Sequence, residues 1–312
     1  MEREILSLDR QLEYDPKVEG GLYLENIENF FVIGMGGSAL AADLLNSIPD
    51  INISIHSDYG IPKKIPEKSL FILISHSGDT EEVIDAFKLA KENKLKMIVI
   101  STNGKLLKLA EDNNIPRIKL PDIDIEPRLA MGFHVKAILT VMGKTDLIYK
   151  INELAGDFKS REFENSGKEL ADWLKGRIPL IYSSVNNEGI ANYFKISFNE
   201  TGKIPAFSNS FPELNHNEMA SFGNEGPDGN FACILIRDDD DPDIIKKRMD
   251  ALKKIYNDKK MPVENIVLKM NDIEKIFSAV SLAGWTAYYL AEAYGNDPKD
   301  SSVVESFKEK IK

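Results

Sequence analysis

Short apolar runs alternate with amphipathic segments along nearly the whole chain, which has 312 residues. In the first half, runs with the length and composition of buried strands lie at residues 30–33, 51–55, 70–74, 97–100 and 117–120. Helix-like segments lie at residues 38–46, 80–93, 105–113 and 128–143. Strands that alternate with helices are joined by crossover connections, so this pattern predicts an α/β fold with a parallel sheet.

The second half of the chain shows the same alternation again. Strands are predicted at residues 178–183, 205–208, 232–236 and 266–268, and helices at residues 188–198, 244–256 and 273–294. A chain of this length exceeds one ordinary hydrophobic core. We therefore expect two domains, residues 1–150 and residues 151–312, the second of which begins with a helix and a polar linker at residues 152–167.

The charge balance limits the partners of the chain. Its formal net charge is −11, which disfavours binding to nucleic acid or to anionic membrane surfaces, because both require basic patches. The longest apolar helix candidate, residues 276–294, contains Ser281, Thr286 and Glu292, and we interpret it as a buried core helix rather than a membrane span. The single cysteine, Cys233, cannot form a disulfide within the chain, so we expect a buried thiol and a cytoplasmic protein.

A hydroxyl-rich turn, residues 75–80, separates one buried strand from the following helix. Its sequence, Ser-His-Ser-Gly-Asp-Thr, places Ser75, Ser77 and Thr80 where backbone N–H groups and the positive end of a helix dipole converge. Helix capping alone needs one hydroxyl, and this turn has three. Hydroxyl groups donate to phosphate oxygens without adding charge, so we favour a site for a phosphorylated small molecule.

A glycine-rich loop follows the first strand and supports two interpretations. Residues 34–39 read Gly-Met-Gly-Gly-Ser-Ala, which fits the dinucleotide-binding pattern, and Asp58 lies near the position of a ribose-binding acid. A nicotinamide- or flavin-dependent oxidoreductase is therefore an alternative. However, Ser38 can converge with the later hydroxyl-rich turn at the carboxyl edge of the sheet, while Gly36 and Gly37 allow close backbone approach to a sugar phosphate.

Two groups in the second half could move protons. Glu200 ends an apolar helix just before Gly202, and His216 lies in a polar loop. A carboxylate and an imidazole suffice for proton transfer on a sugar phosphate. The alternatives are a solvated glutamate at a helix end and a loop histidine satisfied by neighbouring asparagines. No two of the four histidines have the spacing of metal ligands, so no metal site is predicted.

Together, residues 34–38, 75–80, 198–207 and 212–218 with Pro127-Arg128 resemble the bifunctional phosphoglucose/phosphomannose isomerase family of sugar isomerase (SIS) domain proteins. The resemblance covers almost the whole chain. It implies an α/β fold of two doubly wound parallel-sheet domains, flavodoxin-like SIS domains in tandem. It also implies reversible conversion of fructose 6-phosphate to glucose 6-phosphate and mannose 6-phosphate through a cis-enediol intermediate, with no metal or other cofactor.

The resemblance also implies a role for each matching residue. Glu200 matches the base that moves a proton between C1 and C2, and Arg128 matches the group that stabilises the enediolate. His216 and a C-terminal lysine, best matched by Lys308, match the groups that open the sugar ring. The positions that match the phosphate site are Gly36, Gly37, Ser38, Ser75, Ser77 and Thr80.

Two further expectations concern assembly and specificity. The family is dimeric, so the resemblance implies a homodimer in which His216 reaches the neighbouring subunit's site. Where family members often have Thr-Pro before the closing helix, this chain has Ser301 and Ser302, either of which could serve mannose 6-phosphate. Lys310 and Lys312 lie close to Lys308 in the sequence, so the choice among the three C-terminal lysines stays open. The alternative from another class is an SIS protein that senses sugar phosphates without chemistry.

Overall fold

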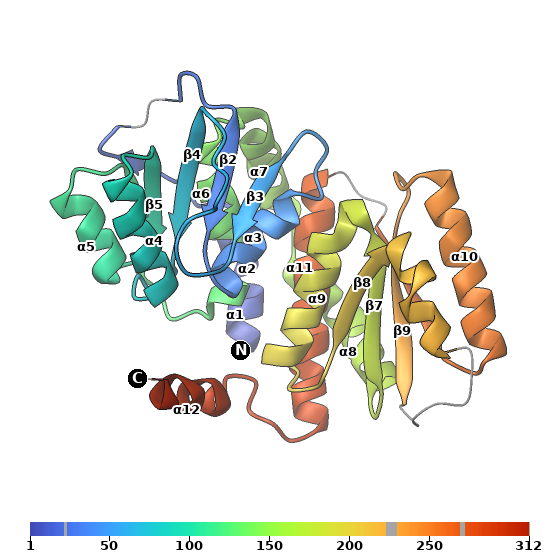
Figure 1. Cartoon of the computed structure of the whole chain (residues 1–312). Coiled ribbons are helices and arrows are strands. Elements are labelled where there is room, and N and C mark those ends of the chain that lie inside the picture. The colour runs from blue at the N-terminus through green and yellow to red at the C-terminus, as the bar shows by residue number, and fades with distance from the viewer. Residues whose placement is uncertain (22–23, 223–229, 269–271, 312) are drawn as a thin grey trace. The chain divides into compact units, whose positions relative to one another are not determined.

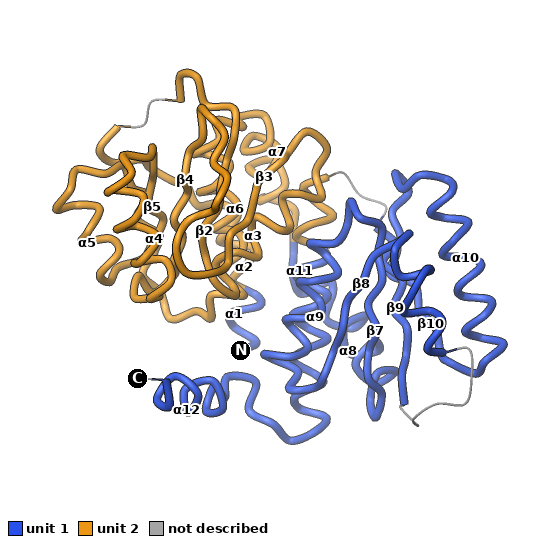
Figure 2. The backbone as a smooth tube through the Cα atoms, viewed as in Figure 1, with its two compact units in different colours: residues 1–6, 159–270, 278–312 blue, residues 7–158, 271–277 orange. Residues whose placement is uncertain are grey.

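The computed structural model describes residues 1–21, 24–222, 230–268 and 272–311 (Figure 1). The chain forms two compact units, coloured separately in Figure 2. Unit 2 contains Ser7–Phe158 and Asn271–Phe277, and unit 1 contains Met1–Leu6, Lys159–Met270 and Ser278–Lys312. The main division of the chain therefore falls between Phe158 and Lys159.

Unit 2 is built on a six-stranded sheet with the order β1-β6-β5-β4-β2-β3. Its parallel strands are β2 (Asn29–Ile33), β3 (Ile53–His56), β4 (Ser69–Ile74), β5 (Met97–Ser101) and β6 (Arg117–Lys119). The sequence did not predict β1 (Val18–Glu19), which pairs antiparallel with β6 at the edge. Strand β4 is buried along its whole length because it lies in the middle of the sheet and both of its faces are covered.

Helices cover both faces of this sheet (Figure 1). They are α2 (Leu8–Gln11), α3 (Gly37–Leu45), α4 (Glu81–Glu92), α5 (Gly104–Asp112), α6 (Met131–Val141) and α7 (Thr145–Asp157). Alternate side chains of β2 and β4, including the stacked pair Phe31 and Phe71, form a core with Val83 and Phe87 of α4. This alternation is the two-residue period of a strand, and it fixes which strand residues meet α4.

The predicted continuous helix over residues 128–143 is wrong. A 3₁₀ turn occupies Pro127–Leu129, and α6 begins only at Met131. The buried side chain of Gln11 stabilises the interruption, because its amide donates to the carbonyl O of Leu129 at 2.8 Å and accepts from the N–H of Gly132 at 2.9 Å. The side chain thus satisfies backbone groups that a continuous helix would satisfy itself.

Unit 1 has a four-stranded parallel sheet with the order β10-β9-β7-β8. The strands are β7 (Ile178–Ser184), β8 (Phe207–Phe211), β9 (Phe231–Asp238) and β10 (Val263–Leu268). The helices are α1 (Glu2–Leu6), α8 (Glu164–Leu174), α9 (Glu188–Glu200), α10 (Asp243–Asp258), α11 (Asp272–Ala293) and α12 (Ser302–Lys310), with α11 belonging to unit 1 from Ser278 onward. Its core contains Tyr182, Phe211 and Cys233, so the prediction of a buried thiol is confirmed.

Both sheets share one topology. Counting the parallel strands along the chain, from β2 in unit 2 and from β7 in unit 1, the second strand lies at one side of the first, and the third and fourth lie at the other. This is the flavodoxin-like order. The prediction of two doubly wound α/β domains is therefore confirmed. The switch point of unit 2 lies between the carboxyl ends of β2 and β4, where ligands bind in such folds. In the described residues, no helix combines the length and apolar character that a membrane crossing requires.

Candidate active site

The structure brings the two predicted phosphate loops together at the switch point of unit 2. The hydroxyl of Ser38, at the start of α3, accepts a hydrogen bond of 3.1 Å from the backbone N–H of His76. Ser75, which is fully buried, accepts from the N–H of Gly78 at 3.0 Å and has its Oγ 2.8 Å from Oγ1 of Thr80. Ser38 and Ser75 thus hold the residue 75–80 turn from inside.

The loop that follows β5 supports the same turn from the other side. Gly78 has φ +76°, and a Cβ atom there would lie 1.8 Å from the carbonyl O of Asn103. A Cβ atom on Gly104, which has φ +79°, would lie 2.4 Å from the carbonyl O of Ser77. Only glycine fits a left-handed conformation at such close backbone approach, so the two glycines fix the shape of the turn.

The hydroxyls of the turn do not cap the following helix. Thr80 precedes α4, but within the described residues its hydroxyl contacts Ser75 and makes no cap hydrogen bond to the helix. Ser77 is exposed, and its Oγ accepts from the N–H of Asp79 at 3.3 Å. The carboxylate of Asp79 accepts from the N–H of Lys105 at 3.3 Å. The acidic side chain therefore interacts with the start of α5, beside the turn.

Arg128 lies against the glycine loop in the same unit. A Cβ atom on Gly37 would lie 2.6 Å from the backbone N of Arg128, so the start of α3 and the 3₁₀ turn at Pro127–Leu129 are in direct backbone contact. The guanidinium is buried and forms an ion pair of 2.8 Å with Glu126. This ion pair, together with Gln11 beneath the turn, fixes the place of a positive charge next to the glycine loop.

The structure places Glu200, His216 and Lys308 in unit 1. Glu200 is the last residue of α9 and is exposed. His216 ends a 3₁₀ turn at Glu213–His216 and is also exposed, as is Lys308 on α12. Lys310 lies on the same helix, and Lys312 lies outside the described residues. The predicted site residues therefore fall into two sets. The serine and threonine hydroxyls and Arg128 belong to unit 2, and the candidate proton-transfer residues belong to unit 1.

A network that the sequence did not reveal holds the loop of His216. Glu218 accepts a hydrogen bond of 2.6 Å from the hydroxyl of Tyr182 on β7, and its other oxygen accepts from the side-chain amide of Asn209 on β8. Burial raises the pKa of Tyr182 well above its ordinary value, so the phenol stays protonated and remains a donor. The segment beyond His216 is therefore attached to two adjacent strands.

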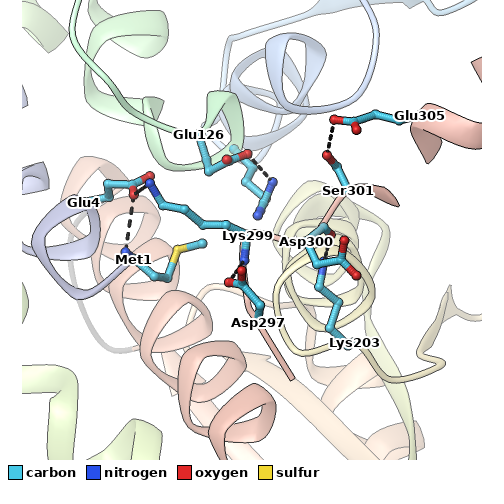
Figure 3. Close-up of polar contacts among 10 residues, drawn as sticks. Met1, Glu4, Glu126, Lys203, Asp297, Lys299, Asp300, Ser301 and Glu305 are labelled. Carbon is cyan, nitrogen blue, oxygen red and sulfur yellow. Dashed lines mark hydrogen bonds and ion pairs between the residues drawn. The ribbon is translucent and has the colours of Figure 1, made fainter. Parts of the chain in front are cut away.

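The segment before α12 is anchored to the start of the chain within unit 1 (Figure 3). Lys299 forms an ion pair of 2.5 Å with Glu4 on α1, and the hydroxyl of Ser301 donates to Glu305 at 2.5 Å. Lys203, three residues after Glu200, donates to the carbonyl O of Asp300. The residues ahead of α12 thus have fixed partners, one of which lies next to the C-terminal end of α9.

Sequence reasoning missed Gln11, Glu126, Glu218 and the buried pair His76 and His134. Each acts on a partner that the sequence did not indicate, such as Leu129, which is 118 positions from Gln11. The described parts of the chain contain no group of three or more histidine, cysteine or acidic side chains arranged to hold a metal ion.

Comparisons with known proteins agree with the fold of two SIS domains. The protein-family model of the SIS domain matches residues 23–121, and that of the bacterial phospho-glucose isomerase C-terminal SIS domain matches residues 163–311. Among solved structures, tagatose-6-phosphate ketose/aldose isomerase from Escherichia coli has the same fold, with a TM-score of 0.67 and 17% identity over 88% of this chain and 84% of that one.

Full-length relatives are more similar in sequence. The bifunctional phosphoglucose/phosphomannose isomerase of Caldicellulosiruptor bescii is 30% identical over 97% of this chain and 95% of its own length. The protein of the same name from Aquifex aeolicus is 31% identical over 89% of each chain. Identity at this level over nearly the full length, with SIS matches in both halves, shows that the chain belongs to the bifunctional phosphoglucose/phosphomannose isomerase family.

Proposed function

We propose that this protein interconverts fructose 6-phosphate with glucose 6-phosphate and mannose 6-phosphate. The observation that carries the proposal is the hydrogen bond between Ser38 and the N–H of His76, which joins two hydroxyl-bearing turns at the switch point of unit 2. A phosphoryl group is the guest that suits such a place, because backbone N–H groups and hydroxyls donate to its oxygens without needing a basic protein surface. This neutral mode of binding fits a protein whose formal net charge is −11.

In this proposal the phosphate site divides into two layers. Ser77 and Thr80, which retain solvent exposure, contact the phosphoryl oxygens together with the N–H groups at the start of α4. Ser38 and Ser75 form the buried layer, which completes the site and keeps its shape. Gly36 and Gly37 bring the backbone of the first loop close to the sugar.

The reaction itself requires a base, a stabilised oxyanion and an open-chain sugar. Glu200 takes the proton from C2 of the aldose and returns it to C1, and Arg128 stabilises the negative oxygen of the enediolate. His216 and Lys308 move protons on the ring oxygen and the C1 hydroxyl to open the ring. A positioned acid or base of this kind contributes a factor of about 10² to 10⁴ in rate. No step of this scheme calls for a bound metal or an organic cofactor.

We further propose that the active protein is a homodimer in which His216 serves the neighbouring subunit. The exposure of His216 supports this arrangement, since its side chain projects from the 3₁₀ turn into solvent within its own chain. The anchoring of its loop through Glu218 would hold the imidazole at a fixed place on the subunit surface. Ser301 or Ser302, at the start of α12, is proposed to support mannose 6-phosphate.

The dinucleotide alternative has less support from the geometry. The carboxylate of Asp58, which would bind a ribose, accepts from the N–H of the next residue, Tyr59, at 2.7 Å. A thermal-shift experiment separates the two functions, since a hexose 6-phosphate should raise the melting temperature and NAD should not.

Glu200→Gln tests the chemistry. The amide cannot accept the C2 proton, so kcat for fructose 6-phosphate should fall by about 10² or more, while the inhibition constant of inorganic phosphate stays unchanged. Glu169→Gln is the matched control, because Glu169 is an exposed glutamate on α8 of the same unit. A Glu200→Gln enzyme with nearly normal kcat would show that another group is the base. A wild-type protein that binds hexose 6-phosphates without turnover would favour the sensor alternative.

A further inference from the structure

Two imidazole rings meet inside unit 2, directly behind the phosphate turn. Nδ1 of His76, within the turn, lies 3.2 Å from Nε2 of His134 on α6, and the rings are nearly perpendicular. His134 is fully buried and His76 is 8% exposed. Neither ring takes part in the proposed proton transfers, so the pair needs its own explanation.

His76 is the residue at which four segments of unit 2 meet. Its backbone N–H donates to the hydroxyl of Ser38 at the start of α3. Its carbonyl O accepts from both the N–H and the hydroxyl of Thr102 after β5, at 3.1 and 2.6 Å. The contact of its side chain with His134 adds α6 as the fourth element. His76 therefore reaches α3 and the loop after β5 through its backbone, and α6 through its imidazole.

Only one hydrogen can lie between the two ring nitrogens, and the surroundings of His134 decide which ring supplies it. Nδ1 of His134 is buried and has no hydrogen-bond partner among the described residues. If His76 donated, His134 would carry its hydrogen on Nδ1 as a buried N–H with no acceptor. Orphaned buried N–H groups are rarer in native proteins than unpaired acceptors. His134 therefore donates through Nε2, and His76 accepts at Nδ1 and carries its hydrogen on Nε2.

Both rings remain uncharged in this arrangement. Burial lowers the pKa of His134 to about 3. Burial also lowers the pKa of His76, against the opposing effect of the Asp122 carboxylate in the segment after β6. A protonated His76 would have to donate through Nδ1 and would force the unpaired N–H onto His134. The imidazole pair thus keeps one protonation state and one geometry at neutral pH.

We propose that His134 is a positioning residue that, through its hydrogen bond to His76, holds the residue 75–80 turn in the shape that receives the phosphoryl group. The proposal rests on the proposed function, because it takes this turn as the phosphate site. It adds a residue on α6 that never touches the substrate. It also gives His76, which lies between two serines of the turn, a definite structural role.

The tautomers can be measured without any assay of activity. Protein labelled with ¹⁵N-histidine contains four histidines, and long-range ¹H–¹⁵N NMR spectra distinguish protonated from bare ring nitrogens. We expect both His76 and His134 to be neutral at pH 7, with hydrogen on Nε2 and none on Nδ1. Hydrogen on Nδ1 of His76, or a charged ring at either position, would overturn the proposed bond even if the protein proved to be an isomerase.

Binding of inorganic phosphate tests the consequence of the bond. His134→Leu removes the donor, and we expect the phosphate Kd and the KM for fructose 6-phosphate to rise about tenfold while kcat changes less than threefold. His134→Gln keeps an N–H donor near the same place and should restore most of the affinity. Thr140→Ala on the same helix, which removes a hydroxyl bonded to the carbonyl O of Lys136, is the control and should leave the phosphate Kd unchanged.

The outcomes separate a positioning role from a merely structural one. A lower melting temperature with unchanged phosphate Kd in His134→Leu, or equal losses of affinity in the leucine and glutamine variants, would contradict the proposal. If His134→Leu does not fold, the phosphate Kd of His134→Gln tests the positioning role. An unchanged phosphate Kd supports the role, and a tenfold higher phosphate Kd contradicts it. If the wild-type protein does not bind phosphate, the proposed function fails, and the NMR result still decides the state of the pair.

Discussion

Replacing Gly37 with alanine probes the contact that places Arg128 beside the glycine loop. The added methyl group would lie 2.6 Å from the backbone N of Arg128 and 2.8 Å from the carbonyl C of Pro127. Because both neighbours are backbone atoms, no side-chain rotation relieves the clash. The loop and the 3₁₀ turn must separate by roughly 0.5–1 Å, which typically costs about 1–3 kcal/mol of stability.

The same movement displaces the guanidinium from the place where the enediolate is proposed to form. A misplacement of about 1 Å in an active site can lower the rate about 10²-fold. We therefore expect kcat/KM for fructose 6-phosphate to fall between about 10- and 100-fold in Gly37→Ala. Coupled assay of glucose 6-phosphate formation gives the rate, and urea unfolding gives the free energy of unfolding.

Gly156→Ala is the matched control in the same unit. Gly156 lies on α7, and a Cβ atom there would meet nothing within 4 Å. Alanine should leave kcat/KM unchanged and should raise the free energy of unfolding by up to about 1 kcal/mol, because glycine is a poor helix former. If Gly37→Ala matched the wild type in both rate and stability, the glycine loop would not pack against Arg128 as described.

Three further variants test other parts of the account. Ser77→Ala removes an exposed hydroxyl of the turn. The KM for fructose 6-phosphate should rise about 5- to 10-fold with little change in kcat, as expected for the loss of one hydrogen bond of about 1–1.5 kcal/mol. An unchanged KM would show that Ser77 does not contact the substrate. His134 has a folded-state pKa of about 3, below the ordinary 6.5, so its contribution to stability is complete above pH 6.5 and is lost as pH falls, by about 1.4 kcal/mol per unit until near pH 3. Urea unfolding between pH 7 and pH 5 should show a steeper loss in the wild type than in His134→Gln, in which only His76 retains a lowered pKa in this pair, and equal slopes would contradict it. Tyr182→Phe removes the donor to Glu218 and should lower kcat/KM several-fold through the loop of His216, with phosphate inhibition unchanged; a change in phosphate inhibition instead would contradict the assignment.

The elements that the sequence predicted well are those in which one pattern dominates locally. Strand β4 is a run of apolar residues with turns at both ends, and α4 carries a clear stripe of buried residues, so length and periodicity sufficed. The prediction of a continuous helix over residues 128–143 was wrong because a distant residue decides the structure there. The residues of this segment favour a helix, and only the distant side chain of Gln11 makes a 3₁₀ turn and a new helix start more stable there.

The candidate site shows the same division. The hydroxyls of Ser75 and Thr80 could be predicted because a strand, a turn and a helix follow one another directly in the sequence. The support from Thr102 and the pairing of His76 with His134 depend on segments 26 and 58 residues away. Such contacts follow from the order of strands in the sheet, and a single sequence carries no local pattern that reports them.

The central claim is that a base on the protein moves a proton between C2 and C1 of a hexose 6-phosphate. Conversion of fructose 6-phosphate in D₂O tests this claim most directly, with ¹H NMR of the C2 position of the glucose 6-phosphate that forms. A carboxylate base exchanges its proton with solvent in at least part of the turnovers, so we predict deuterium at C2 with the wild-type protein and no conversion with Glu200→Gln. Glucose 6-phosphate formed without any deuterium at C2, or formed equally fast by Glu200→Gln, would contradict the account.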